Sequence, residues 1–424
     1  MVDRTLAPVF RQVEHIDLIK AEPFVLDNNI KLYVINGGEQ ELVRIELVFK
    51  NVNWNPAKPL QAYTVNSMLV EGTSKLNAQQ IAERIDYYGA FLQVDYNYDY
   101  STVILYTLTK HLEATIPVVK DIVTDSVFAE AELQTFKTNQ KQKLLVSLEK
   151  NDYLGRRLFN NTLFGDTIYG YKTEVFDYDR LDRSQLLEYF EAAYQPDNCT
   201  IIASGKIEKD SISLLNKYFG SNWESGSEIK PNMFSFEREK GTEHYFERPD
   251  ALQSAIRLGK LCVNRSHIDF PGLQVLNTVL GGYFSSRLMS NIREDKGYTY
   301  GIGSAIVSLQ NAGYFVIGSE VGAEVCTAAV NEIEREIKVL QTELIPYEEL
   351  ELVRNYMMGS LLGSLENALS HADKFKNILF SGLTYEYYNQ YIDVVKTITA
   401  EELQQLAIKY LSFDDLEKVI VGKR

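Results

Sequence analysis

The sequence predicts an α+β fold made of two duplicated domains, each an antiparallel-rich sheet with helices packed on one face. Three observations predict it. The 424 residues exceed the usual size of a single hydrophobic core. Stretches with the two-residue apolar alternation of strands and stretches with helical periodicity follow one another in runs. Short motifs of the first half also recur in the second half, in the same order.

The recurring motifs lie about half the chain length apart. The hexapeptide that begins at Leu144 resembles the one that begins at Leu361, an offset of 217 residues (361 − 144). The matched positions are Leu144 with Leu361, Tyr194 with Tyr410, and Gly89 with Gly297. One short match can arise by chance, whereas three matches in one order favour duplication. We therefore expect the first two pairs to occupy equivalent places in the two halves, within one residue.

Composition limits the class of protein. Hydrophobic residues at 45% and charged residues at 24% are typical of a soluble globular chain. The net charge of −15 argues against nucleic-acid binding, which needs clustered cations. Cys199, Cys262 and Cys326 are isolated, so no disulfide framework is expected. The start of the chain is polar, and no apolar stretch is long enough for a membrane span. These features predict a cytoplasmic protein, or a periplasmic one if a leader was removed before this numbering.

The first half contains several short predicted elements. In chain order they are strands at 30–34 and 43–49 around a turn, helices near 60–70 and 77–89, two strands within 91–108, helices from 111 to about 164, a helix at 184–194 and a buried strand at 200–203. Gly72 and Gly89 are expected to end helices, and Asn77 to cap one. The tyrosine-rich run Tyr96–Tyr100 is interpreted as a half-exposed strand rather than a binding site.

A polar segment divides the two halves. Residues 220–240 contain several Ser and Gly residues and few apolar ones, which is typical of a linker. We therefore expect an N-terminal domain at 1–220, a linker at 221–240 and a C-terminal domain at 241–424.

The stretch Ser286–Tyr300 is expected to form a helix, a turn and the start of a strand. Ser285 or Ser286 can cap the helix, and Gly297 follows its last turn, where a left-handed residue is favoured. The strand is predicted to begin at Tyr298.

This helix-turn-strand corner can bring Arg293 and Tyr300 to one place. Both side chains donate hydrogen bonds, and together they can bind a carbonyl oxygen or an oxyanion. Taken alone, however, these residues favour a simpler interpretation, in which Arg293 is a surface helix residue and Tyr300 packs in the core. Strand alternation is expected to place Tyr298 and Tyr300 on the same face.

The chain resembles the M16, or pitrilysin-like, zinc peptidase family over nearly its whole length. The segments that carry the resemblance are Met68–Thr73, Tyr194–Asn198 and Leu280–Tyr300, the last with Gly281, Gly282, Arg287, Arg293, Gly297 and Tyr300. It looks most like the short chains of this family that assemble in pairs. The resemblance implies halves of the LuxS-metalloenzyme-like fold. It also implies that Arg293 and Tyr300 contact substrate beside a zinc ion.

The chain departs from the family where the zinc ligands are expected. Active members carry HxxEH on a helix, with two histidines on one face and a glutamate as general base. Here the corresponding residues are Tyr63, Thr64, Val65, Asn66 and Ser67. The window Lys143–Leu145, where the third ligand of the family would fall, contains no acid; nearby Glu149 is repeated as Glu366 and is interpreted as structural.

Histidines elsewhere do not rebuild a zinc site in the sequence. His15, His111, His244, His267 and His371 are scattered along the chain, and each is interpreted as a core or surface residue. A phenol, an amide and a hydroxyl are poor substitutes for two imidazoles and a carboxylate. We therefore expect no metal in this chain, with Tyr63, Asn66 and Ser67 as the degenerate zinc-site positions.

Loss of the zinc residues with retention of Arg293 and Tyr300 resembles the non-catalytic subunit of a heterodimeric M16 metallopeptidase. The resemblance implies a subunit that is inactive alone, binds an unstructured peptide and completes the active site of an HxxEH-bearing partner that holds the zinc. Pairing with a second copy of itself stays open. One alternative is a purely structural or peptide-binding subunit without a catalytic role. Another, an atypical self-sufficient peptidase, is disfavoured because no histidine pair has ligand spacing.

Overall fold

The computed structural model describes residues 16–226, 228–236 and 241–424. The first half contains a six-stranded sheet in the order β1-β2-β6-β3-β5-β4. Its strands are β1 (Glu22–Val25), β2 (Lys31–Asn36), β3 (Leu42–Lys50), β4 (Phe91–Tyr96), β5 (Tyr100–Leu108) and β6 (Cys199–Gly205). β2 runs parallel to β6, and the other neighbours are antiparallel.

The second half repeats this sheet without the extra edge strand β1. Its order is β7-β11-β8-β10-β9, and only β7 and β11 are parallel. The strands are β7 (Glu243–Glu247), β8 (Gln253–Cys262), β9 (Thr299–Ser308), β10 (Gly313–Gly322) and β11 (Glu417–Gly422). Strand for strand, this is the order and direction of β2-β6-β3-β5-β4. The predicted α+β fold of two related halves is therefore confirmed.

The two strands at 30–34 and 43–49 form as predicted, but they are not paired with each other. β6 lies between β2 and β3 and is hydrogen-bonded to both. Its residues Ile201–Ala203 are buried, as are the faces of its neighbours. A strand that is apolar on both faces suits the middle of a sheet, which explains why β6 takes the central place.

Helices make up most of the remaining chain. In the first half they are α1 (Gln61–Met68), α2 (Ala78–Asp86), α3 (Leu112–Thr124), α4 (Glu130–Leu148), α5 (Asn151–Phe164), α6 (Val175–Arg180), α7 (Arg183–Ala193) and α8 (Lys209–Phe219). In the second half they are α9 (Phe270–Asn277), α10 (Cys326–Thr342), α11 (Tyr347–Gly363), α12 (Ala368–Leu379), α13 (Glu386–Thr397) and α14 (Ala400–Tyr410), with two wide π-type helices, η4 (Thr278–Gly282) and η5 (Met289–Asp295).

The predicted sequence recurrences fall on matching elements. α4 and α11 begin 217 residues apart (347 − 130), as do α5 and α12 (368 − 151) and α7 and α14 (400 − 183). Leu144 and Leu361 therefore hold the same position in their helices, and both are buried. Asn77 caps α2 with a reciprocal bond to Gln80, as predicted.

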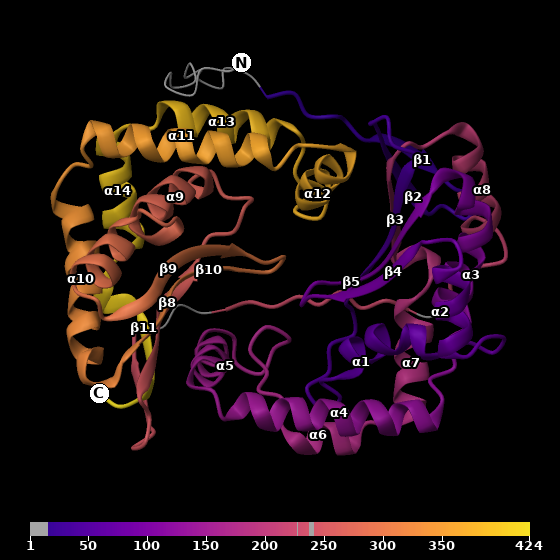
Figure 1. Cartoon of the computed structure of the whole chain (residues 1–424), viewed down its shortest axis with the longest axis horizontal. Helices are drawn as coiled ribbons and strands as arrows, with labels where there is room; N and C mark the ends of the chain where they lie inside the picture. The colour runs from indigo at the N-terminus through magenta and orange to yellow at the C-terminus, as the bar shows by residue number, and fades with distance from the viewer. Residues whose placement is uncertain (1–15, 227, 237–240) are drawn as a thin grey trace, which may run out of the picture.

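Each half contributes one helix to the other half's sheet. α5 packs on β8 and β11 of the second sheet, while α12 packs on β2 and β6 of the first (Figure 1). Phe159 of α5 lies in a buried cluster with Val419 and Val421, and Ala372 of α12 lies in another with Ile35 and Ile202. Each sheet therefore has its own helices on one face and a helix from the other half on the opposite face.

The described part of the polar segment 221–240 is held against both halves. Pro231 forms a bridge with Val52, and the Asn232 side chain accepts from the Trp54 backbone amide at 2.8 Å. Phe234 packs with Tyr169 beside the cluster under α5. Although the composition is that of a linker, Pro231, Asn232 and Phe234 are held in place by these contacts.

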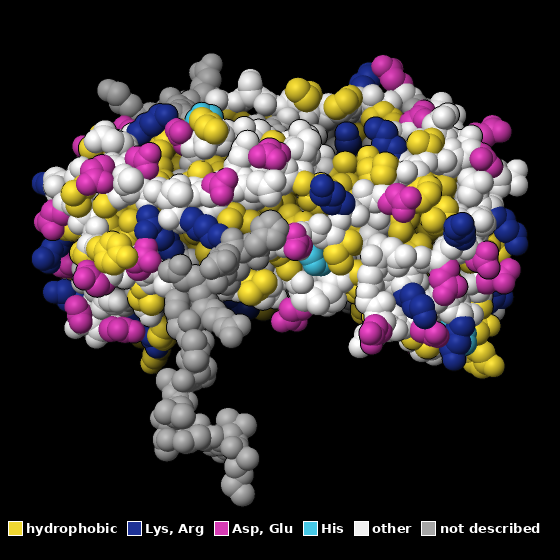
Figure 2. Space-filling model, turned by 90° about the horizontal axis from the view of Figure 1, so that it is seen from above, with side chains coloured by type: hydrophobic (Ala, Val, Ile, Leu, Met, Phe, Trp, Pro, Cys, Tyr) yellow, Lys and Arg dark blue, Asp and Glu magenta, His cyan; other side chains and the backbone are white. Residues whose placement is uncertain are grey.

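Within the described residues, none of the helices is long and apolar enough to cross a membrane. On the face seen in Figure 2, acidic and basic side chains are interspersed, and no large area of one sign forms.

Candidate functional site

The degenerate zinc-site segment Tyr63–Ser67 lies on α1, as the resemblance implies. This helix continues as a short turn and ends at Gly72, whose φ of 149° favours glycine. Thr64, Val65 and Asn66 are buried against the core of the first half, while Tyr63 and Ser67 are half-buried. The helix therefore leaves Tyr63 and Ser67, the two positions at which the resemblance implies histidines, on its less buried side.

These side chains do not fit a zinc ion. The Asn66 amide oxygen is buried and accepts a hydrogen bond from the Tyr194 hydroxyl at 3.1 Å. The Tyr63 ring packs edge-on against Tyr96, with centroids 5.5 Å apart. Burial raises the pKa of Tyr63, and its hydrogen bond with Ser67 offsets only part of this rise. A protonated phenol and an amide already engaged in a hydrogen bond cannot supply the anionic or imidazole ligands that zinc requires.

The window for the third ligand comes from α4, and the structure brings it to the same place. Lys143 and Leu144 line one cavity together with Tyr63. Neither side chain can bind zinc as the expected glutamate would, so the positions that the resemblance assigns to ligands come together here without a metal-binding side chain. In the part of the chain that the structure describes, no group of three or more His, Cys, Asp or Glu residues is arranged to hold a metal ion.

The described histidines have structural surroundings, as predicted. The His371 ring accepts from the Ile19 backbone amide at 3.2 Å, and burial lowers its pKa. His244 lies 2.7 Å from the Thr242 hydroxyl, and the His111 ring packs against Tyr88. His15 lies outside the described residues.

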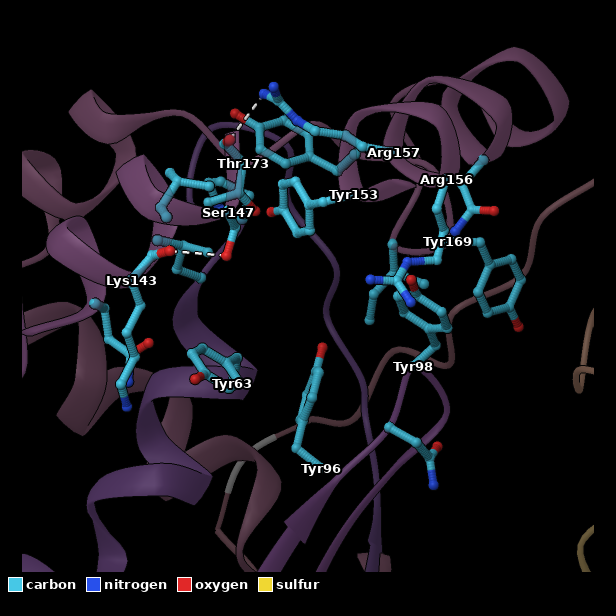
Figure 3. A pocket seen from close by; sticks show the side chains of 18 of the residues that line it. Tyr63, Tyr96, Tyr98, Lys143, Ser147, Tyr153, Arg156, Arg157, Tyr169 and Thr173 are labelled. Atoms are coloured by element: carbon cyan, nitrogen blue, oxygen red, sulfur yellow. Dashed lines mark hydrogen bonds between the residues drawn. The ribbon is translucent and has the colours of Figure 1, made fainter. Parts of the chain in front are cut away.

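The cavity beside α1 has a volume of about 630 Å³ and is rich in tyrosine (Figure 3). Its lining comes from α1, the β4–β5 turn, α4, α5 and the segment that leads into α6. The tyrosines are Tyr63, Tyr96, Tyr98, Tyr153, Tyr169, Tyr171 and Tyr178, and the cations are Lys143, Arg156 and Arg157. None of its lining residues is an aspartate or glutamate.

This cavity is not predicted by the sequence. The interpretation of Tyr96–Tyr100 as a half-exposed strand is wrong, because β4 ends at Tyr96 and β5 begins at Tyr100, so the intervening residues form a tight turn. The turn directs Tyr96 and Tyr98 into the cavity. The clustering of tyrosines in the run Tyr96–Tyr100 was the only hint in the sequence. The other tyrosines of the cavity lie on distant segments, and only the fold brings them together.

The second predicted site starts from the segment Ser286–Tyr300. Its helix runs as a short α-turn and then as the wide helix η5, close to the predicted limits, and Gly297 has the predicted left-handed φ of 66°. Two contacts fix the helix. Arg287 makes a bidentate ion pair with Glu349 of α11 at 2.9 and 2.8 Å, and the Asn291 amide donates to Glu332 and Glu336 of α10.

Arg293 and Tyr300 are both accessible. Arg293 is half-buried near the end of η5, with its guanidinium 4.6 Å from the centre of the exposed Phe284 ring. Its ion pair with Glu294, at 3.7 Å, lies at the surface. Tyr300 is 92% exposed, which rules out the core-aromatic interpretation of this residue. Within the described residues, no hydrogen bond joins the two side chains.

The expectation that Tyr298 and Tyr300 share one face is wrong. β9 begins one residue later than predicted, at Thr299, and its pairing with β10 is irregular between Ser319 and Val321. This bulge breaks the alternation of side chains. As a result, Tyr298 packs against the second core while Tyr300 points to solvent.

Gly281 has a packing role. A Cβ at this position would lie 2.7 Å from the Ser304 backbone nitrogen, so the glycine allows η4 to approach β9 closely. Gly281 is buried, so it belongs to the packed contact between η4 and β9.

Comparison with known proteins agrees with this geometry. The profile of the family described as "Peptidase M16 inactive domain" matches residues 180–357, which include Arg293 and Tyr300. The uncharacterized zinc protease YmxG of Bacillus subtilis is 27% identical over 83% of this chain and 86% of its own length. The chain is therefore similar to M16 proteins of the inactive-domain type, in sequence over its middle part and in fold over nearly its whole length.

One solved structure has a similar fold, and one further relative is described as a non-peptidase. The structure of a peptidase M16 inactive domain from Pseudomonas fluorescens covers 95% of this chain and 98% of its own, with a TM-score of 0.86 and 20% identity. A protein of Helicobacter pylori described as "Non-peptidase homolog YmxG" is 20% identical over 84% of this chain and 83% of its own length.

Proposed function

We propose that this chain is the non-catalytic subunit of a heterodimeric M16 metallopeptidase. It binds an unstructured peptide and completes the active site of a partner chain that carries HxxEH. The partner holds the zinc, and this chain holds none. The observation that carries the proposal is the state of α1, where Tyr63, Asn66 and Ser67 replace the zinc residues while Arg293 and Tyr300 stay accessible.

The surroundings of Arg293 suit a role in binding a carbonyl oxygen. The Arg293 guanidinium lies over the Phe284 ring, with its central carbon 4.6 Å from the ring centre. This cation–π contact restrains the side chain without a hydrogen bond to an acceptor. The carbonyl of the scissile bond can accept from the guanidinium N–H groups as negative charge develops on its oxygen.

Exposure of Tyr300 also favours an assembled complex. A tyrosine that is 92% exposed gains no stability from the fold of its own chain. Its ring and hydroxyl are available to a substrate or partner, where tyrosine is a favoured contact residue.

The first prediction tests the roles of Arg293 and Tyr300. Arg293→Ala and Tyr300→Phe should leave folding and assembly intact but lower peptide hydrolysis by the complex. Loss of one transition-state donor costs roughly 2–4 kcal/mol, or about 10²–10³-fold in rate. Arg293→Lys should also be slow, because an ammonium lacks the planar fork. The assay uses the zinc-loaded complex with the HxxEH partner and an unstructured peptide.

Matched controls separate these roles from general effects. Arg335→Ala removes an exposed arginine of α10, and Tyr347→Phe removes the hydroxyl of a tyrosine that is 70% exposed. Both should hydrolyse peptide at the normal rate. If the Arg293 and Tyr300 variants match these controls in a complex of confirmed size, the chain is a structural or peptide-binding subunit instead. The Helicobacter pylori homologue described as a non-peptidase favours that second function.

A further inference from the structure

The cavity beside α1 has an unusual charge for this chain. The whole chain has 58 acidic and 43 basic residues, yet the cavity is lined by three cations and no carboxylate. Three carboxylates that lie near it are already bonded: Asp99 to Tyr169, Asp177 to Tyr171, and Glu174 to Arg157. The charge that faces into the cavity is therefore positive.

Two of the three cations are available to a ligand. Arg157 pairs with Glu174 and donates to the Thr173 carbonyl at 2.8 Å, so it holds the segment before α6 in place. Within the described residues, Lys143 and Arg156 make no ion pair, and both are exposed. The guanidinium of Arg156 reaches toward the cavity beside Tyr98 (Figure 3).

The tyrosines supply further hydrogen-bond donors. The hydroxyls of Tyr96, Tyr153 and Tyr178 make no hydrogen bond in the part of the chain that the structure describes, and the Tyr96 hydroxyl points into the middle of the cavity (Figure 3). Burial raises the pKa of Tyr96 and Tyr178, so both phenols keep their protons at neutral pH. A protonated phenol can donate to an anion, whereas a phenolate would repel one.

We propose that this cavity, at the place of the lost zinc site, binds a carboxylate of a peptide. Arg156 and Lys143 attract the anion, the phenol of Tyr96 donates to it, and the aromatic walls contact the neighbouring side chain or backbone. Tyrosine faces also attract cations, but a lysine or arginine of the ligand would meet Arg156 and Lys143 here and be repelled. The proposed function supplies the assumption that the ligand is a peptide. The present inference adds that the peptide binds through a carboxylate.

Three forms of one short unstructured peptide distinguish the sources of the carboxylate. One has Asp and Glu side chains and an amidated C-terminus. The second has Asn and Gln instead and a free C-terminal carboxylate. The third has Asn and Gln and an amidated end. Binding to the isolated full-length chain is followed by fluorescence anisotropy. The third peptide should bind at least about tenfold more weakly than whichever of the first two binds tighter, since a charge-assisted hydrogen bond is worth roughly 1.5–3 kcal/mol.

Variants locate the binding. Arg156→Ala should weaken binding of the tighter peptide about tenfold or more, and Tyr96→Phe, which removes one oxygen atom, by severalfold. Two controls should bind normally. Arg335→Ala removes the same charge at a distant exposed site. Lys374→Ala alters the corresponding cavity of the second half. Lys374 lies 217 residues after Arg157 (374 − 157), which is the offset between matching helices of the two halves.

The inference is overturned if the neutral peptide binds as well as the others, if none binds, or if Lys374→Ala weakens binding as much as Arg156→Ala. The binding assay contains no partner chain and measures no hydrolysis. Its failure can therefore be told from failure of the proposed function, which appears as normal hydrolysis by the Arg293 and Tyr300 variants.

Discussion

At the scale of single residues, α1 is stabilised by contacts between its side chains and the surrounding core. Asn66 is 1% exposed and bonded to Tyr194, and Tyr63 packs among the rings of Tyr96 and Phe136. A buried amide that keeps its hydrogen bond, and a large ring that fills space, each stabilise the local fold. From these contacts we predict that the helix is stable without zinc.

The second prediction follows from these residues. After dialysis against a weak chelator, elemental analysis should find far less than one zinc per chain, and a chelator should leave the unfolding temperature unchanged. A structural zinc site contributes roughly 10 kcal/mol or more to a fold, so a bound ion would be conspicuous in both measurements. A stoichiometric zinc that disappears in Tyr63→Phe or Ser67→Ala would contradict the prediction.

At the scale of elements, the segment from η5 to β9 is positioned by helices that follow it in the chain. Arg287 reaches Glu349 on α11, and Asn291 reaches two glutamates of α10. The Arg287 and Glu349 side chains are only 15% and 26% exposed, so water screens their pairing less than it would at the surface. These contacts fix the helix that presents Arg293.

The third prediction concerns this ion pair. Arg287→Ala should lower the free energy of unfolding by about 1.5–3 kcal/mol, the range for a charge-assisted hydrogen bond whose partner stays behind. Urea unfolding measures it. In a double-mutant cycle, Glu349→Gln should cost little once Arg287 is already removed. Additive losses would show that the two side chains do not act as a pair. Peptide hydrolysis should fall as well, because Arg293 loses its support.

At the scale of the whole molecule, the halves are joined by exchanged helices and by buried charges. Glu46 of β3 is fully buried and pairs with Lys376 of α12 at 2.6 Å and with Arg44 at 2.7 Å. Arg44 also reaches Asp373 of α12 at 2.9 Å. Removing α12 would leave Glu46 without one of its two cations, which is costly in a buried site.

The fourth prediction is that the two halves unfold together. Both tryptophans, Trp54 and Trp223, report on the first half and the connection, whereas far-ultraviolet circular dichroism reports on the whole chain. Their urea transitions should coincide. A fragment that ends at Phe236 should fail to fold as a monomer, since α12 would be missing from its sheet. Two separate transitions, or a stable fragment, would show that the halves are independent.

The sequence by itself determined the local elements and the character of the α1 site. The alternation of apolar residues, helical periodicity and capping residues depend on a few neighbours in the chain. The strands, the cap at Asn77 and the helix ends at Gly89 and Gly297 could therefore be predicted. The absence of HxxEH is a property of side-chain chemistry, and it needs no fold to be recognised. Duplication was visible because α4 and α11 kept similar sequences at equivalent positions.

Only the tertiary structure decided which elements meet. The central place of β6, the exchange of α5 and α12, and the bulge that turns Tyr300 outward all depend on pairings between distant segments. The tyrosine cavity is of the same kind, since Tyr63, Tyr96 and Arg156 are far apart in the chain. Local propensity carries no information on such contacts. They are selected by the burial of apolar faces in the complete fold.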